Sequence, residues 1–400
     1  MKNISCSLNN VRSRYFMLLA CLSLLLATTS CNNDELEFND SQPSKQYTKA
    51  ELIEYALSKL PKTRANGDMP VVMVTDKTEV SIFGAFIGPM TIYWGDGAKD
   101  PSSNYDGSPH PYTDGEPCHV IFLKKDTPSS AVEELWIDDN GLIYLDIANN
   151  TKLTTLSCTN NELEMLDFSG CKALEILIAS NNKLKSVDMT PLVRLQELHL
   201  DENELEYLDI SNHSLLHMAT LDYNPTKELN VSNTPALSWL TLENLPIEKI
   251  NHLSIHDSSF VGFPELPKLG YLNISRTPFT SLDISMNPEL SSLNVSHSKI
   301  KHLNISNGAI GIVYANNSEL TNLIYSPDEI LNLYTLRIDY TPFEKLSSNL
   351  YPLLTSGLPD RNQPDKYNRP LQGYLYTQST LLVKPFLIYL DNKNWKVINP

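Results

Sequence analysis

The chain has 400 residues, of which 41% are apolar, and its 31 basic and 47 acidic side chains give a formal net charge of −16. This length and apolar content suffice for one large domain with a smaller module beside it. The acidic balance repels nucleic acid and anionic lipid surfaces, which excludes binding to them and favours neutral or basic partners.

Residues 1–30 have the pattern of a secretory signal peptide. Three basic residues and no acid precede an apolar run over residues 15–27, and small residues then lead to Cys31. The run is too short to span a bilayer. The segment resembles the lipobox of bacterial lipoproteins, although Thr28 stands where leucine is more usual. The resemblance implies that Cys31 is lipidated and anchors the mature chain; an ordinary secreted protein with an incidental Cys31 is the alternative.

Residues 31–46 are polar, acidic and too poor in apolar side chains to pack, which predicts a flexible tether. The acids between Asn33 and Glu37 resemble the surface-export signal of Bacteroidetes lipoproteins. That resemblance implies an outer-membrane lipid anchor and a place on the cell surface, with a periplasmic orientation as the alternative. Without the three basic residues of the signal peptide, 28 basic residues face 47 acids, so the mature net charge would be −19.

Residues 47–131 predict a helix followed by a β-rich region. Thr48 can cap a short helix that Pro61 ends. Residues 69–125 then alternate with a period of two between Gly, Pro and Asp turns, which is typical of strands. The phrase TIYWGDG over residues 91–97 resembles the hairpin of PKD-like β-sandwich domains, but Pro117 and Cys118 depart from that pattern. An independent domain, a half-domain and a cap on the following region all stay open.

Three acids in this region, Asp96, Asp100 and Asp106, could be interpreted as a calcium loop. Their spacing does not follow the EF-hand pattern. Aspartate is also common in turns because its side chain accepts hydrogen bonds from nearby backbone. We therefore expect turn formation and no metal site.

Residues 132–346 repeat a pattern of 21 residues. Clear copies begin at Val132, Leu153, Leu174, Leu195 and Leu216. Apolar residues in the order LxxLxLxxNxL at such a period indicate a leucine-rich-repeat solenoid, in which each coil adds one strand to a parallel sheet and buries its apolar side against its neighbours.

Two polar columns recur in frame. Asparagine fills the ninth position of the first five copies, where it can satisfy backbone groups as the chain leaves the strand. Aspartate recurs in the phrase LDxS, which predicts a short extended segment on the opposite side and is architecture rather than an acidic site. The two columns are Asn140, Asn161, Asn182, Asn203 and Asn224, and Asp146, Asp167, Asp188 and Asp209.

The repeat becomes irregular after the sixth copy. That copy opens at Leu237, but the next clear start is Leu269, 32 residues later. Residues 252–268 therefore contain either a shortened coil or an insertion, and an insertion between coils often forms a loop on the binding face. The whole pattern predicts about ten coils. Residues 347–400 predict a C-terminal cap with Trp395 buried.

The copy LTTLSCTNNELEMLDFSGCKA resembles the repeat of internalin-type leucine-rich-repeat proteins. With the lipobox and the WGDG phrase, the chain resembles the leucine-rich-repeat surface lipoproteins of gut Bacteroidetes. The resemblance implies recognition of a protein or a host surface, as in adhesion, and not catalysis.

Catalytic and metal-binding motifs were not found in the sequence. It contains no G-x-S-x-G, no H-E-x-x-H and no phosphate-binding loop. His252 and His256 are four residues apart, but that spacing puts two side chains on one face only in a helix. No CxxC pair is present. We therefore expect neither enzymatic activity nor a cofactor.

The predicted site is the concave face, where outward strand positions carry aromatic residues typical of interface hot spots. Trp136 and Trp239 lie five coils apart, about 24 Å at roughly 4.8 Å per coil, which favours a broad protein footprint. Acids in the first coils favour a basic partner. A glycan-binding accessory lipoprotein, with rings stacking on sugars, is the alternative, and so are scattered surface residues without a partner. The predicted ligand-binding residues are Trp136, His199, Tyr223, Trp239, Tyr271, Tyr314, Tyr334 and Tyr340.

Overall fold

The computed structural model describes residues 47–61, 68–103, 105–255, 262–343, 353, 358, 373–377 and 393–398. From Thr48 onward these residues form one compact unit. Cys31, the tether and most of the predicted C-terminal cap lie outside the described residues.

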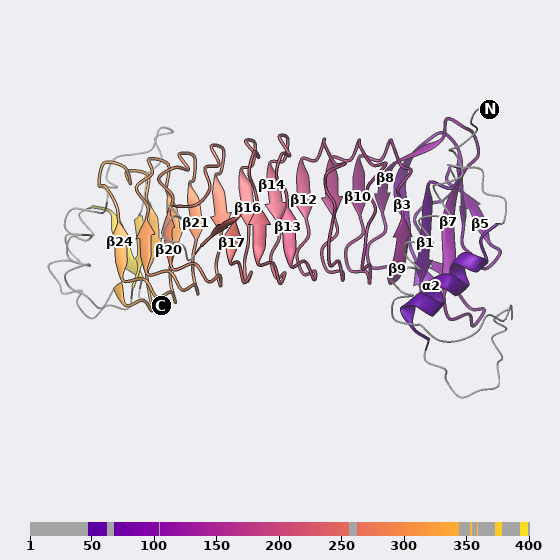
Figure 1. Ribbon diagram of the computed structural model, residues 1–400, viewed down its shortest axis with the longest axis horizontal. Coiled ribbons are helices and arrows are strands. Elements are labelled where there is room, and N and C mark those ends of the chain that lie inside the picture. The colour runs from indigo at the N-terminus through magenta and orange to yellow at the C-terminus, as the bar shows by residue number, and fades with distance from the viewer. Residues whose placement is uncertain are drawn as a thin grey trace, which may run out of the picture. The chain divides into compact units, whose positions relative to one another are not determined.

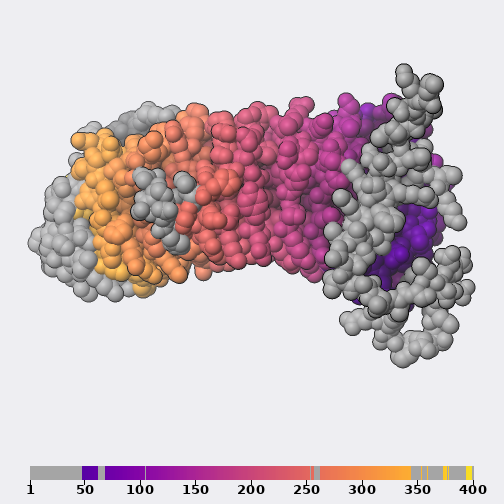
Figure 2. All heavy atoms as spheres, viewed as in Figure 1, coloured from indigo at the N-terminus to yellow at the C-terminus, as the bar shows by residue number. Residues whose placement is uncertain are grey.

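Thirteen of the described strands form one long sheet, and from β8 to β27 every neighbouring pair is parallel. Each of the ten coils contributes one strand, and the coils lie side by side in chain order (Figures 1 and 2). The predicted leucine-rich-repeat solenoid is therefore confirmed. The strands of coils 1–10 are β8 (Ala131–Trp136), β10 (Thr155–Ser157), β11 (Ile176–Ile178), β12 (Glu197–His199), β14 (Met218–Thr220), β16 (Trp239–Thr241), β19 (Tyr271–Asn273), β21 (Ser292–Asn294), β23 (Ile312–Tyr314) and β25 (Thr335–Arg337).

Two further strands, β26 (Gly373–Tyr376) and β27 (Trp395–Ile398), continue this sheet beyond coil 10. Trp395 is 2% exposed. Positions are counted below from the first residue of each coil, and the coils begin at Val132, Leu153, Leu174, Leu195, Leu216, Leu237, Leu269, Leu290, Ile310 and Leu333.

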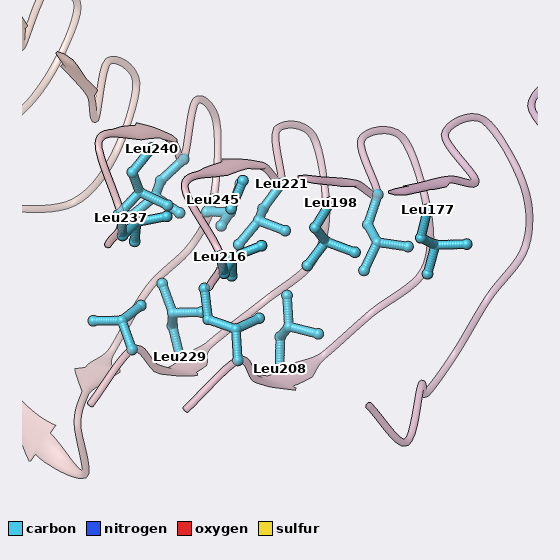
Figure 3. Close-up of a cluster of buried hydrophobic side chains, with 14 of the residues drawn as sticks. Leu177, Leu198, Leu208, Leu216, Leu221, Leu229, Leu237, Leu240 and Leu245 are labelled. Atoms are coloured by element: carbon cyan, nitrogen blue, oxygen red, sulfur yellow. The ribbon is translucent and has the colours of Figure 1, made fainter. Parts of the chain in front are cut away.

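The core runs between the two sides of the coils. Leu177, Leu198 and Leu240 point inward from the long sheet, and Leu208 and Leu229 meet them from the opposite side (Figure 3). These five side chains are at most 2% exposed. Burying a leucine contributes about 1.5–3 kcal/mol, and one coil cannot provide that environment alone, so the stability of the fold is shared between neighbours.

Short strands line the side of the coils opposite the long sheet, which we call the back. In the aspartate column, the Oδ1 atom of each side chain accepts a hydrogen bond from the backbone N–H two residues later. The N–Oδ1 distances are 3.1 Å for Asp146, 2.8 Å for Asp167 and 3.0 Å for Asp188. This column therefore forms turns. The back strands are β13 (Tyr207–Asp209), β15 (Glu228–Asn230), β17 (Lys249–Ile250), β18 (Leu253–Ser254), β20 (Ser281–Asp283), β22 (His302–Asn304) and β24 (Asn322–Ile324).

The asparagine ladder links the first five coils. In coil 4, Asn203 Nδ2 donates to Ala179 O of coil 3 and to Leu200 O of its own coil, at 3.0 and 3.1 Å, and Oδ1 accepts from Leu184 N at 3.1 Å. The ladder ends at coil 6, where the ninth residue is Leu245. Coils 7–10 have Thr or Ser there, and each hydroxyl donates to the carbonyl three residues earlier in the same coil.

The N-terminal region is built into the first coil rather than standing apart from it. Five antiparallel strands form a sheet in the order β5-β4-β7-β1-β9, and β9 is the back segment of coil 1. On the other side, β3 adds to the long sheet antiparallel to β8. The strands are β1 (Val71–Thr75), β3 (Phe83–Ile87), β4 (Met90–Tyr93), β5 (Lys99–Pro101), β7 (His119–Lys125) and β9 (Leu142–Asp146), and β2 (Glu79–Val80) pairs with β6 (His110–Pro111).

Helix α2 (Lys49–Ser58) covers this five-stranded sheet. Thr48 caps it with a reciprocal capping box to Glu51. Ala56 and Leu60 pack in a second small core with Val72, Val74, Cys118, Val120, Phe122 and Ile143. No helix in the described part of the chain is long and apolar enough to cross a membrane.

The WGDG hairpin is a packed structural corner. Trp94 is fully buried, its Nε1 donates to Asp100 Oδ2 at 2.8 Å, and His110 stacks on its ring. Asp96 and Asp106 each accept the N–H two residues later, at 2.9 Å in both cases. These contacts explain the three acids as turn and indole acceptors. Among the described residues, no three His, Cys, Asp or Glu side chains are grouped so that they could hold a metal.

The described residues on either side of the irregularity after coil 6 pair with strands at the back. Strands β16 and β19 pair directly, with Trp239 opposite Tyr271. The long sheet is therefore continuous, although the chain between these two strands is longer than between the others. On the back, β18 turns against β17, and Phe263 N bonds to Asp283 O beside β20. These described residues lie at the back and not on the face that the sequence predicts for binding. His256 falls outside them.

Candidate functional site

The exposed side of the long sheet corresponds to the predicted concave face, and we call it the sheet face. Positions 3 and 5 of each strand point onto it, and positions 7 and 8 follow at the edge where the chain turns away. In coils 4–7 these positions hold a group that we call the central patch, which consists of His199, Asp201, Thr220, Asp222, Tyr223, Trp239, Thr241, Glu243, Tyr271, Asn273 and Arg276.

An aromatic pair lies in the central patch. The rings of Trp239 and Tyr271 stack with centroids 3.9 Å apart and an interplanar angle of 14°. Parallel pairing of β16 with β19 places these position-3 residues next to each other. Trp239 is still 39% exposed, and burial is the largest cause that raises the pKa of Tyr271. The pair is a rigid apolar platform that solvent reaches.

Carboxylates at position 7 line the edge of this platform. Asp201 Oδ1 accepts Asp222 N at 2.9 Å, and Asp222 Oδ1 accepts Glu243 N at 2.6 Å, so each acid bonds to the backbone of the next coil. Burial raises the pKa of the Asp222 carboxyl to about 6, and the charges of Asp201 and Glu243 act in the same direction. Three acids in successive coils therefore share one edge of the patch.

Polar side chains hold the carboxylates in place. Thr220 Oγ1 donates to Asp201, and His199 Nδ1 lies 3.0 Å from the same hydroxyl. Glu243 is bound more fully, because Tyr223 OH donates to its Oε1 at 3.0 Å and Arg276 Nε lies 3.2 Å from that oxygen. The hydrogen bond to Glu243 is the largest cause that raises the pKa of Tyr223. Asn273 Nδ2 reaches Glu243 Oε2 at 3.2 Å.

Position 8 is in the left-handed backbone region in all ten coils. Asparagine, which tolerates that conformation, occupies it in coils 2, 3, 6 and 9. Tyr223 and Arg276 adopt it with φ of 57° and 58° in the central patch. Bulky side chains in this region cost free energy and cluster at functional sites. Because every coil adopts it, the conformation belongs to the repeat, and in coils 5 and 7 it presents Tyr223 and Arg276 at the edge of the patch.

The other predicted site residues lie elsewhere on the sheet face. Trp136 is in coil 1, in register with Phe83 of β3. Tyr314, Tyr334 and Tyr340 belong to coils 9 and 10, and the last two are 38% and 51% exposed. The structure thus brings Trp239 and Tyr271 into contact, links Tyr223 through Glu243 to Asn273 and Arg276 of coil 7, and leaves Trp136 and the three C-terminal tyrosines in separate groups.

The prediction from sequence missed Asp222, Glu243, Thr220 and Asn273 as members of the patch. A signal for the two acids was present, because position 7 is also acidic in coils 1, 4 and 10. The threonine and the asparagine carried no such signal, since their roles depend on which side chain lies opposite in the next coil.

Among the described residues, acids elsewhere on the solenoid form ion pairs that Asp201 and Asp222 do not form. Lys249 pairs with Glu228 at 2.5 Å on the back, and Lys268 pairs with Glu289 at 2.6 Å just before the starts of coils 7 and 8. Within the described ranges, no lysine or arginine lies within ion-pair distance of Asp201 or Asp222. The central patch therefore keeps negative charge that the chain does not neutralise.

No protein-family model matches the chain, and no curated protein sequence matches it. The solved structure of YopM, a leucine-rich effector from Yersinia pestis, is 22% identical over 54% of this chain and 62% of that one, with a TM-score of 0.42. The functional domain of InlJ from Listeria monocytogenes is 18% identical over 66% and 63%, with a TM-score of 0.39. The leucine-rich-repeat domain of APL1B is 18% identical over 66% and 80%, with a TM-score of 0.45.

The matched part of this chain spans less than two thirds of the YopM and InlJ structures. At these identities the similarity concerns the repeat fold alone. The chain is a leucine-rich-repeat solenoid whose sheet face carries an aromatic and acidic patch at coils 4–7.

Proposed function

We propose that the protein is a lipid-anchored surface recognition or adhesion protein that binds a protein partner through the sheet face. The stacked, solvent-exposed pair of Trp239 and Tyr271 carries this proposal, because exposed aromatic rings on a rigid sheet are typical anchors of interfaces. The unneutralised acids beside the pair favour a basic partner. The proposal includes no enzymatic activity.

The anchor and its place are part of the same proposal. Cys31 follows an apolar segment that resembles a lipobox, and the acids behind it resemble a surface-export signal of Bacteroidetes lipoproteins. An outer-membrane anchor with the solenoid outside the cell would present the sheet face to host proteins.

Protease shaving of intact cells that express the full chain with a C-terminal tag tests the orientation. Loss of the tag on intact cells is the expected result, because the solenoid would lie outside. A tag that survives on intact cells but disappears after lysis contradicts a surface role and leaves a periplasmic partner to be sought.

Binding to host proteins is tested by a screen with the purified protein. We expect Trp239→Ala to weaken the interaction by about 2 kcal/mol, or about 30-fold, as for a central hot spot. Tyr207→Ala is the matched control, because Tyr207 is an aromatic residue on the back with 46% exposure. Equal losses in both variants would contradict binding through the sheet face.

One observation favours a glycan ligand as the second candidate. The two rings lie beside a carboxylate, Glu243, and an amide, Asn273, which is the combination that sugars use for stacking and hydrogen bonding. A glycan array decides between the two. Sugar binding that Trp239→Ala abolishes, with no protein captured, would replace the protein-partner proposal.

A further inference from the structure

We propose that the central patch contains a subsite for a basic side chain of the partner, where Asp201, Asp222 and Glu243 surround the cation beside the stacked aromatic pair. This inference rests on the proposed function and adds to it the chemistry of the group that is recognised. Four features of the patch support it.

The chain itself shows what the position-7 acids bind. In coil 10, Arg337 reaches both oxygens of the fully buried Asp339, at 3.1 and 3.2 Å. In coil 6, Glu243 takes the guanidinium of Arg276 from coil 7 at 3.2 Å. Both acids accept a guanidinium from their own chain, so a guanidinium fits carboxylates at this position of the coil.

Coils 4 and 5 offer the same carboxylates without such a cation. Positions 5 and 8 are His199 and Glu202 in coil 4, and Thr220 and Tyr223 in coil 5. Asp201 and Asp222 therefore bind hydroxyl and backbone donors but, within the described residues, no guanidinium or ammonium group. A partner could supply the cation that coils 6 and 10 obtain from the chain.

The Thr241 hydroxyl is a second and independent indication. Thr241 is 6% exposed and follows Thr220 at position 5 of the next coil. A weak hydrogen bond from its hydroxyl helps to lower the pKa of the Asp222 carboxyl, but within the described residues no atom meets Oγ1 at full hydrogen-bonding geometry. An unsatisfied buried hydroxyl costs about 1–3 kcal/mol, so it marks a point where a donor from a ligand would be favourable.

The aromatic pair completes the subsite. Glu243 Oε2 lies 3.2 Å from Asn273 Nδ2, and Asn273 follows Tyr271 by two residues on the same face of β19, which places the pair beside the acids. A guanidinium can then contact carboxylate oxygens while it packs against a ring face. A neutral side chain of the same shape would gain the packing but not the ionic contact.

The subsite should respond to pH, because Asp222 must be ionised to bind a cation. Burial raises its pKa to about 6, so its charge is lost between pH 7.5 and pH 5. The titratable and charged groups that face it, directly or through one neighbour, are Asp201, Glu243, Tyr223, Tyr271, Arg276 and His199. Asp222→Asn separates its contribution from theirs.

The test uses purified full-length protein and a fluorescein-labelled hexa-arginine peptide, with binding followed by anisotropy. Hexa-citrulline, which is neutral and nearly the same shape, is the control peptide. We expect Asp222→Asn and Glu243→Gln each to weaken hexa-arginine binding about tenfold. Both substitutions keep an oxygen acceptor for the local hydrogen bonds, so the coil should fold. Glu206→Gln removes the same charge from an exposed position outside the patch and should change nothing.

Arg276→Gln gives a prediction of opposite sign. Its removal frees Glu243 from the chain's own guanidinium, so hexa-arginine should bind about threefold more tightly, in line with a half-exposed ion pair. Lys299→Gln makes the same charge change at an exposed position outside the patch and should have no such effect. Wild-type binding should also weaken from pH 7.5 to pH 5, and Asp222→Asn should lose that dependence.

Three outcomes would overturn the subsite. They are equal binding of hexa-citrulline, equal losses in Glu206→Gln and Asp222→Asn, and an unchanged pH dependence in Asp222→Asn. If a protein partner found in the screen still requires Trp239 while any of these holds, the proposed function stands and only the subsite fails. If no protein partner is found but the patch variants behave as expected, the subsite stands and the proposed function fails.

Discussion

At the scale of single residues, Asp222 combines a structural and a binding role. Its Oδ1 accepts the backbone N–H of Glu243, which fixes the edge of the next coil. Burial raises the pKa of its carboxyl from an ordinary value of 3.8 to about 6. Such a residue lowers stability at neutral pH, and proteins often tolerate that loss at sites where an ionised group is needed.

The sign of this effect can be measured. Because the folded-state pKa is raised, the stabilising contribution is complete below about pH 4 and is lost as pH rises through 6. We expect Asp222→Asn to raise the free energy of unfolding by about 1–2 kcal/mol at pH 7.5, after allowing for partial solvent exposure, and to change it little at pH 4. Urea unfolding at the two pH values measures both.

Asp209→Asn is the control with the opposite sign. Despite some burial, hydrogen bonds from Ser211, Asn230 and Tyr207 lower the pKa of the Asp209 carboxyl. Its contribution is therefore present above the ordinary pKa and falls at lower pH, so the substitution should destabilise the protein at pH 7.5. If both variants shifted the midpoint in the same direction, the burial of Asp222 would not be the cause.

At the scale of the element, the coil depends on its ninth residue. Asn203 is 6% exposed, and its side chain makes four hydrogen bonds, two to coil 3 and two within coil 4. We expect Asn203→Ala to cost about 3 kcal/mol, since it leaves buried backbone groups of two coils without partners. Thermal unfolding of the variant and of the wild type measures this loss in the free energy of unfolding.

Ser298→Ala serves as the matched case from the other half of the solenoid. Its hydroxyl donates to Val295 O and accepts from Ile300 N, both in its own coil, so the expected cost is about 1 kcal/mol. Similar losses at the two positions would contradict the view that the asparagine stabilises the junction between coils rather than one coil.

The coil was also the level at which prediction from sequence was most successful. The 21-residue period predicts the solenoid, the inward leucines and both polar columns, because each depends only on position within one repeat. Contacts between coils were less accessible. Trp239 and Tyr271 are 32 residues apart, and their stacking depends on where the extra residues of coil 6 go. The raised pKa of Asp222 depends on burial, which no in-frame pattern encodes.

At the scale of the whole molecule, the ladder divides the solenoid into two halves. At the ninth position, asparagine amides join neighbouring coils in the first half, Leu245 interrupts the ladder, and hydroxyls in coils 7–10 bond within single coils. The stability of a repeat protein is the sum of its units and their junctions, so weaker junctions allow local opening.

Hydrogen exchange should report this division. We expect the amides of β19, β21 and β23 to exchange faster than those of β10, β11 and β12 under native conditions. The double variant Thr277→Asn and Ser298→Asn should slow exchange in β19 and β21 by extending the ladder. Uniform protection along the wild-type chain would contradict a difference between the halves.

The direct pairing of β16 with β19 has a consequence for how such a chain can change over time. Because the long sheet skips the extra residues, segments of different length can be gained or lost at the back without moving any ring or carboxylate in front. A partner that binds the sheet face contacts the same strands in the same order, whatever the number of residues between two coils. Related chains could therefore drift in length after coil 6 and still be recognised by the same partner, while a single residue gained within a strand would shift every contact beyond it.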